Sequence, residues 1–109
     1  MPLTDRHCRS FAPGTAALSA QETRTLLLQV PLWELDLEGL GLTRDFSFES
    51  YWAEVGFVNA VAWIAQREKH HPDMVLGYKK ARISFRTHDA GGLTENDFIC
   101  AAKVDLLVE

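Results

Sequence analysis

Three of the four histidines in this chain could do chemistry together. His70 and His71 are adjacent and are followed at once by Pro72, while His88 lies further along in "RTHDAGG". An imidazole has an ordinary pKa of about 6.5, so it can give or accept a proton near neutral pH. If the three rings converge, they form an acid–base site that needs no nucleophile, and no serine-nucleophile or phosphate-loop motif competes with it in the sequence.

Two other interpretations of the histidines compete with acid–base chemistry. Exposed histidines at the boundary of an element can be inert, and a metal site would need three or four convergent donor atoms. Cys8 and Cys100 are not placed to supply such donors. Adjacent residues on extended backbone also point their side chains apart, so we expect no metal and no cofactor. The inert and the acid–base interpretations both stay open.

The first half of the chain predicts a helix followed by a hairpin. "SAQE" is a capping box, with Ser19 as N-cap and Glu22 three residues on, and it opens a helix that Pro31 ends. "WELDL" (33–37) and "LTRDFSF" (42–48) alternate apolar and polar residues around a glycine-rich turn. This alternation is typical of two half-buried strands.

A long helix from Ser50 to about Gln66 is expected next, as the central core helix. Its apolar positions follow helical spacing: Tyr51, Val55, Phe57, Val58, Val61, Ala62, Ile64 and Ala65. Pro72 pushes His71 toward extended backbone, so the helix should end just before the histidine pair. Strands at 74–78 and 81–88 follow, and Thr94 with Asp97 caps a last helix.

In the second strand of that pair, two sets of side chains should face opposite ways. Ile83, Phe85 and Thr87 point to one face and Arg82, Ser84, Arg86 and His88 to the other. The element order is α-β-β-α-β-β-α. We therefore predict a single α+β domain at 18–109, a four-stranded antiparallel sheet with three helices packed on one face. Residues 1–17 should be an irregular, loosely held lead-in.

Composition narrows the function classes. A chain of 109 residues fits one domain, and its net charge of −4 argues against binding to nucleic acid or to an anionic membrane. No signal peptide or membrane span is evident, which makes a reducing cytoplasm the default location. Cys8 and Cys100 show no CxxC spacing, so a disulfide is neither excluded nor demanded, and Cys100 should pack as a small hydrophobe.

The pattern "HHPDM…GY…THDAGGLTENDFICAA" resembles the pterin-4a-carbinolamine dehydratase family. The resemblance runs from about Leu18 to Leu107, and "VPLWEL" and "FSF" match the family's upstream hairpin. The positions that match in identity and spacing are His70, His71, Pro72, Tyr78, His88 and Asp97.

The resemblance implies that the protein removes water from a 4a-hydroxytetrahydropterin, giving a quinonoid dihydropterin without metal or cofactor. His70 and His71 would shuttle protons, and His88 would hold or polarise the pterin. The residues that the resemblance assigns to substrate binding are Pro72, Tyr78, Asp97, Gln66 and Met74. Family members look like tetramers assembled from dimers that extend the sheet edge to edge, so we expect a homodimer or a dimer of dimers.

Two positions depart from the family pattern. Gln66 stands where the family places a carboxylate, one helical turn before His70, and Met74 stands where an aromatic is common. A neutral glutamine cannot raise the pKa of an imidazole as a carboxylate would, and Glu68 should face another side of the helix. These departures leave open a non-catalytic dehydratase-like binder. In that case the sharper expectation is a RuBisCO assembly factor of the α-carboxysome, and the partner would be RuBisCO rather than a pterin.

Overall fold

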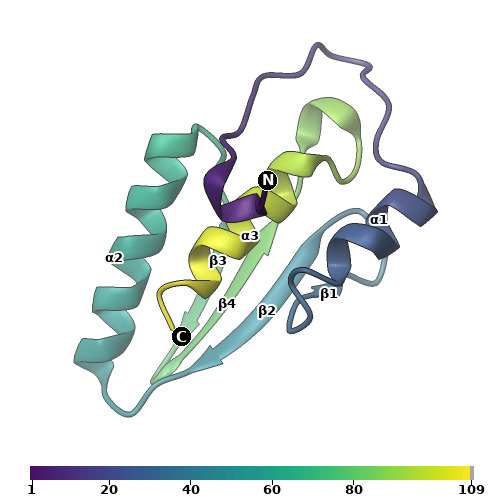
Figure 1. Ribbon diagram of the computed structural model, residues 1–109. Helices are drawn as coiled ribbons and strands as arrows, with labels where there is room; N and C mark the ends of the chain where they lie inside the picture. Colours follow the sequence, from purple (N-terminus) through teal and green to yellow (C-terminus); the bar gives the residue numbers. More distant parts are fainter. Residues whose placement is uncertain (109) are drawn as a thin grey trace.

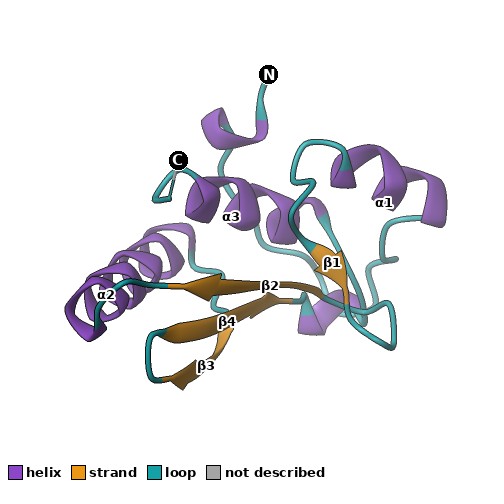
Figure 2. Ribbon diagram, turned by 90° about the horizontal axis from the view of Figure 1, so that it is seen from below, coloured by secondary structure: helices purple, strands orange, loops and turns teal. Residues whose placement is uncertain are grey.

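The structure is a computed structural model that describes residues 1–108. It confirms the expected order of seven main elements. The bounds are α1 Ala20–Leu27, β1 Glu34–Leu35, β2 Leu42–Ser47, α2 Tyr51–Glu68, β3 Asp73–Gly77, β4 Lys80–Phe85 and α3 Glu95–Asp105, with short 3-10 turns at Leu3–Asp5 and His88–Ala90. The sheet is antiparallel throughout, in the order β1-β2-β4-β3. The three α-helices lie on one side of it (Figures 1 and 2).

Helix ends follow the predicted caps. Ser19 and Glu22 form the reciprocal capping box of α1, and Ser50 accepts the backbone N–H of Ala53 at the start of α2. α1 ends at Leu27, earlier than Pro31, and turns fill the gap between them. α2 ends where Lys69 adopts a left-handed conformation with φ of 54°, just before the histidine pair as expected.

The core is centred on α3 rather than on α2, which corrects the sequence-based expectation. Phe98 and Val104 of α3 are completely buried against Leu42, Ile83 and Phe85 of the sheet. α3 lies between α1 and α2 in Figure 1. α2 lies to one side and buries only one stripe, so Tyr51, Trp52 and Trp63 stay exposed. Apolar periodicity finds an amphipathic helix, but it does not tell how much of the helix its neighbours cover.

The first strand is shorter than the alternation predicts. Only Glu34 and Leu35 pair with β2, and Leu35 and Leu37 are exposed whereas Trp33 is buried. The Trp33 indole N–H donates to Asp105 Oδ1 at 2.8 Å. A side-chain contact with α3 therefore fixes the chain at Trp33, just before the paired residues of β1.

The N-terminal segment is not loosely held, which is a second correction. Leu3 is 1% exposed within the core cluster, and the turn at Leu3–Asp5 packs on α3 (Figure 1). Arg6 Nη1 contacts Glu95 Oε1 at 3.2 Å, and the backbone N–H of Leu18 donates to Leu93 O at 2.9 Å. The segment is irregular, as expected, but its contacts make it part of the domain. None of the described helices combines the length and the apolar character needed to cross a membrane.

Candidate active site

His70 directly follows the end of α2, and its side chain points into the protein. The left-handed Lys69 turns the chain, and the backbone N–H groups of both Lys69 and His70 donate to Ala65 O. The His70 side chain is 11% exposed. Its ring stacks on Phe85 of β4, with 6.0 Å between centroids and 12° between planes. The helix end and the sheet therefore hold this imidazole in a fixed orientation.

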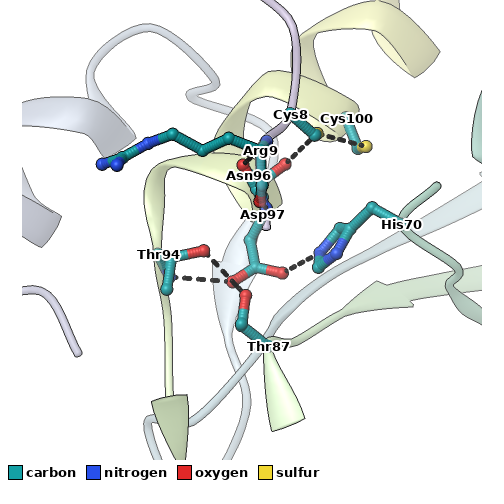
Figure 3. Close-up of polar contacts among 8 residues, drawn as sticks. All are labelled: Cys8, Arg9, His70, Thr87, Thr94, Asn96, Asp97 and Cys100. Atoms are coloured by element: carbon teal, nitrogen blue, oxygen red, sulfur yellow. Dashed lines mark hydrogen bonds and ion pairs between the residues drawn. The ribbon is translucent and has the colours of Figure 1, made fainter. Parts of the chain in front are cut away.

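The His70 ring contacts a buried carboxylate, that of Asp97. His70 Nε2 lies 2.6 Å from Asp97 Oδ1, and Asp97 has no exposed surface (Figure 3). Asp97 Oδ2 accepts the hydroxyl of Thr87 and the backbone N–H of Thr94, each at 2.9 Å. The Thr87 and Thr94 hydroxyls are 2.7 Å apart. Asp97 thus closes the capping box of α3 and contacts the histidine with its other oxygen.

This pairing sets the chemistry of His70. A carboxylate only accepts hydrogen bonds, so the proton of a neutral His70 ring sits on Nε2 and leaves Nδ1 as an acceptor. The first turn of a helix also favours a negative charge, because its backbone N–H groups point toward that end. Asp97 therefore holds one tautomer and one orientation of the His70 ring.

His71 and His88 lie at the same end of the sheet as His70, because His70 and His71 precede β3 and His88 follows β4. β3 begins at Asp73, opposite Ser84, so the residues before β3 lie near those that follow Phe85 at the end of β4. His71 is exposed in that connection, and an exposed His88 begins the 3-10 turn directly after Thr87. The hydrogen-bonded series from His70 through Asp97 to Thr87 therefore ends one residue before the third histidine.

Four other predicted site residues take no part in this hydrogen-bonded network. Tyr78 is in the turn between β3 and β4 and is 72% exposed. The five residues of β3 place it about 16 Å from the histidine end of its own chain. Met74 is half-buried and packs against the core. Gln66 is exposed, and the carboxylate that contacts His70 comes from α3 instead. Pro72 is half-buried beside His71.

Glu68 is a residue whose role the sequence did not reveal. Its side chain is 5% exposed, and it accepts Lys103 Nζ at 2.8 Å and the Cys8 backbone N–H at 2.7 Å. Its Oε2 also lies 2.9 Å from His7 Nδ1. Burial alone would raise its pKa, but the hydrogen bonds from Lys103, Cys8 and His7 outweigh it and lower the pKa to about 2. Glu68 does face away from His70, as expected, and joins the last turn of α2 to the N-terminal segment.

Partners far apart in the chain explain why sequence reasoning missed these contacts. Glu68 is 60 positions from Cys8 and 35 from Lys103. The capping box identified Thr94 and Asp97, but nothing in it indicates that Asp97 also meets His70. Alternation predicts that Thr87 shares a face with Ile83 and Phe85, and all three are buried; this was the only sequence signal for Thr87. Among residues 1–108, no cluster of three or more His, Cys, Asp or Glu side chains is arranged to hold a metal ion.

Comparisons with known proteins identify the family of the chain. Residues 16–107 match the family described as pterin 4 alpha carbinolamine dehydratase. A Stenotrophomonas maltophilia protein whose name places it in the same family is 48% identical over 109 residues, covering 100% of this chain and 94% of the relative.

Solved structures give the same result for the fold. A transcriptional coactivator/pterin dehydratase from Brucella melitensis superposes with a TM-score of 0.82 at 26% identity, over 85% of this chain and 99% of that one. A pterin dehydratase-like protein identified as a RuBisCO assembly factor in the α-carboxysome gives a TM-score of 0.60 at 25% identity, over 69% and 87%. Sequence and fold lead to one conclusion: this chain belongs to the pterin-4a-carbinolamine dehydratase family.

Proposed function

We propose that the protein dehydrates a 4a-hydroxytetrahydropterin to the quinonoid dihydropterin, with His70, His71 and His88 as its acid–base groups. The family makes a pterin the expected substrate. The elimination breaks the bond between C4a and the hydroxyl oxygen, which leaves as water after it gains a proton. A proton on a ring nitrogen is lost, so the site needs one donor and one acceptor.

The single observation that carries this proposal is the contact of His70 Nε2 with the buried Asp97 carboxylate at 2.6 Å. Burying a carboxylate costs free energy unless its oxygens are hydrogen-bonded. Both oxygens of Asp97 have partners, namely His70, Thr87 and the backbone of Thr94. It gives His70 the carboxylate partner that Gln66 does not provide. The contact with Asp97 therefore weakens the argument that the glutamine at position 66 makes the site inactive.

The exposure of the three rings suggests how they divide the work. His71 and His88 are exposed and would contact the pterin directly. His70 is mostly buried and would form the floor of the site. In this arrangement His71 gives a proton to the departing hydroxyl, and His70 accepts the proton that the ring nitrogen loses. His88 holds the pterin and shares the proton transfer. Groups positioned in this way contribute about 10²–10⁴-fold to a rate.

The test is the decay of synthetic 4a-hydroxytetrahydropterin, followed by absorbance with and without protein. We expect catalysis that His71→Ala and His88→Ala each reduce by at least about 100-fold. His7→Ala is the matched control, because it removes the remaining histidine and should keep the rate. Decay at the uncatalysed rate with folded wild-type protein would refute the proposal, and so would full activity in both site variants.

A second candidate function is a non-catalytic assembly factor for RuBisCO. Its support is the likeness to the α-carboxysome protein, which spans less of the chain and superposes less closely than the Brucella melitensis dehydratase. Co-expression with RuBisCO subunits separates the two functions. An increased yield of assembled carboxylase that His71→Ala retains would support the assembly factor, and an unchanged yield would count against it.

We also propose that the protein forms a homo-oligomer through β3. β3 is an edge strand of the sheet, and Val75, Leu76 and Tyr78 on and beside it are more than half exposed. An exposed apolar edge invites pairing with another strand, and a second copy would extend the sheet. Light scattering after gel filtration should give a dimer or tetramer, and Val75→Lys should shift it toward the monomer. A wild-type monomer at high concentration would exclude this pairing.

A further inference from the structure

Two cysteines from opposite ends of the chain meet beside the site. Cys8 Sγ and Cys100 Sγ are 3.6 Å apart although 92 positions separate them in the sequence (Figure 3). Cys8 is half-buried in the irregular N-terminal segment, and Cys100 is completely buried on α3. Both are free thiols in the structure.

Contacts on both sides of Cys8 fix its position. Its backbone N–H donates to Glu68 Oε1 at 2.7 Å, and its thiol lies 3.6 Å from Asn96 O. The next residue, Arg9, makes two hydrogen bonds with the Asn96 side chain: its N–H donates to Oδ1 at 3.1 Å, and its carbonyl accepts Nδ2 at 2.7 Å. The pairing of the sulfurs is therefore set by polar contacts that hold the backbone against the start of α3.

We propose that Cys8 and Cys100 are a thiol pair that a peroxide oxidises to a reversible intramolecular disulfide. In the first step the Cys8 sulfur attacks a peroxide oxygen and the O–O bond breaks. With hydrogen peroxide this gives a sulfenic acid on Cys8 and one water. In the second step Cys100 Sγ attacks Cys8 Sγ, the sulfenic oxygen leaves as water, and the S–S bond forms. Two thiols lose two electrons and two protons, and the peroxide gains them.

Burial assigns the order of the two steps. Cys8 is open in part to solvent, so it is the sulfur that a dissolved peroxide can reach. Cys100 is completely buried, so a dissolved peroxide cannot reach its sulfur while the protein is folded. Cys100 therefore acts as the resolving thiol from inside the protein.

The geometry requires only a small movement. A disulfide has an S–S distance of about 2.05 Å, so the sulfurs must approach by about 1.5 Å. Cys8 lies outside regular secondary structure, and its segment can shift without breaking a helix or strand. The bond would join the N-terminal segment to α3 one helical turn after Asp97, the partner of His70.

The experiment uses the full chain, reduced and freed of reductant, and treats it with a small excess of hydrogen peroxide at neutral pH. We expect both thiols to disappear in a thiol count and the intact mass to fall by two hydrogen atoms. Dithiothreitol should restore both. A bond that closes so long a loop should also raise the Tm by about 10 °C.

Two variants identify the order of attack. In Cys100→Ser, dimedone should trap a sulfenic acid on Cys8, because no resolving thiol remains. In Cys8→Ser, Cys100 should stay reduced until a denaturant unfolds the chain. Cys100→Ala repeats the first test with an apolar residue in the buried position, in case serine disturbs the fold.

Two results would overturn the proposal. One is wild-type protein that keeps both thiols when folded and loses them only after unfolding. The other is a disulfide that forms only between two chains, seen as a doubled mass without reductant. The readouts are thiols, mass and Tm rather than pterin turnover, so the result does not depend on the proposed function.

Discussion

Replacing Glu68 by glutamine tests whether a buried carboxylate holds the N-terminal segment to the domain. Glu68 accepts Lys103 Nζ, the Cys8 backbone N–H and His7, and these hydrogen bonds overcome the effect of burial to lower its pKa from 4.5 to about 2. A difference of this size between the unfolded and folded pKa corresponds to about 3 kcal/mol of stability at neutral pH. Glutamine keeps the shape of the side chain but removes its charge, and it leaves Lys103 largely buried without its anion.

The sign of the pH dependence follows from the lowered pKa. The folded state favours the ionised carboxylate, so its contribution is complete above the unfolded pKa of about 4.5 and is lost as the pH falls toward 2. We therefore expect Glu68→Gln to be about 3 kcal/mol less stable than wild type at pH 7. At pH 3 the difference should fall to about half, because part of the wild-type contribution has gone.

Urea unfolding at pH 7, 5 and 3 measures this difference, provided that the m-values of the two proteins agree. Glu38→Gln is the matched control, because Glu38 is exposed and its replacement should change the free energy of unfolding by less than about 0.5 kcal/mol. A deficit in Glu68→Gln that stays constant from pH 7 to pH 3 would mean that lost packing, and not the carboxylate charge, causes it. No deficit at pH 7 would refute the reasoning altogether.

Three further outcomes are expected. Leu3→Ala should reduce the free energy of unfolding by about 2–4 kcal/mol in urea, whereas Met1→Ala, 80% exposed, should have little effect; equal stability would show that the lead-in is not part of the core. Asp97→Asn should cost about 2–3 kcal/mol by the same measurement, because its three hydrogen-bond partners lose an anionic acceptor, and wild-type stability would contradict the network. Gln66→Glu should raise the dehydration rate by less than about fivefold, since position 66 is exposed and His70 already has a carboxylate; a larger rise would make the missing family carboxylate the main defect.

Local signals predicted the fold well because each is written in neighbouring residues. The capping boxes at Ser19 and Thr94 and the proline after the histidine pair located three helix ends. Alternation in the strand now called β4 placed Ile83 and Phe85 in the core. These features depend on contacts within a few residues, so a single sequence contains them in full.

The candidate site was predicted only in part. Residue types and the family resemblance indicated His70 and Asp97, but the contact between them joins the end of one helix to the start of another. The burial of α3 in preference to α2, and of Leu3 in the core, also depends on packing between distant segments. Tyr78 matched the family spacing, yet the β3–β4 hairpin carries it to the opposite end of the sheet. Spacing along the chain does not determine distance across a fold.

The contacts between the N-terminal segment and α3 have a consequence for how the chain acquires its structure. Leu3, Arg6 and Arg9 contact a helix that begins at Glu95, 89 positions after Arg6, so α3 must be synthesised before they can dock. Closing so large a loop is entropically unfavourable and makes these contacts late events on the folding route. Residues that are synthesised before the rest of the domain would then be among the last to dock, and a nascent chain stalled before Glu95 would expose Leu3 to chaperones and proteases.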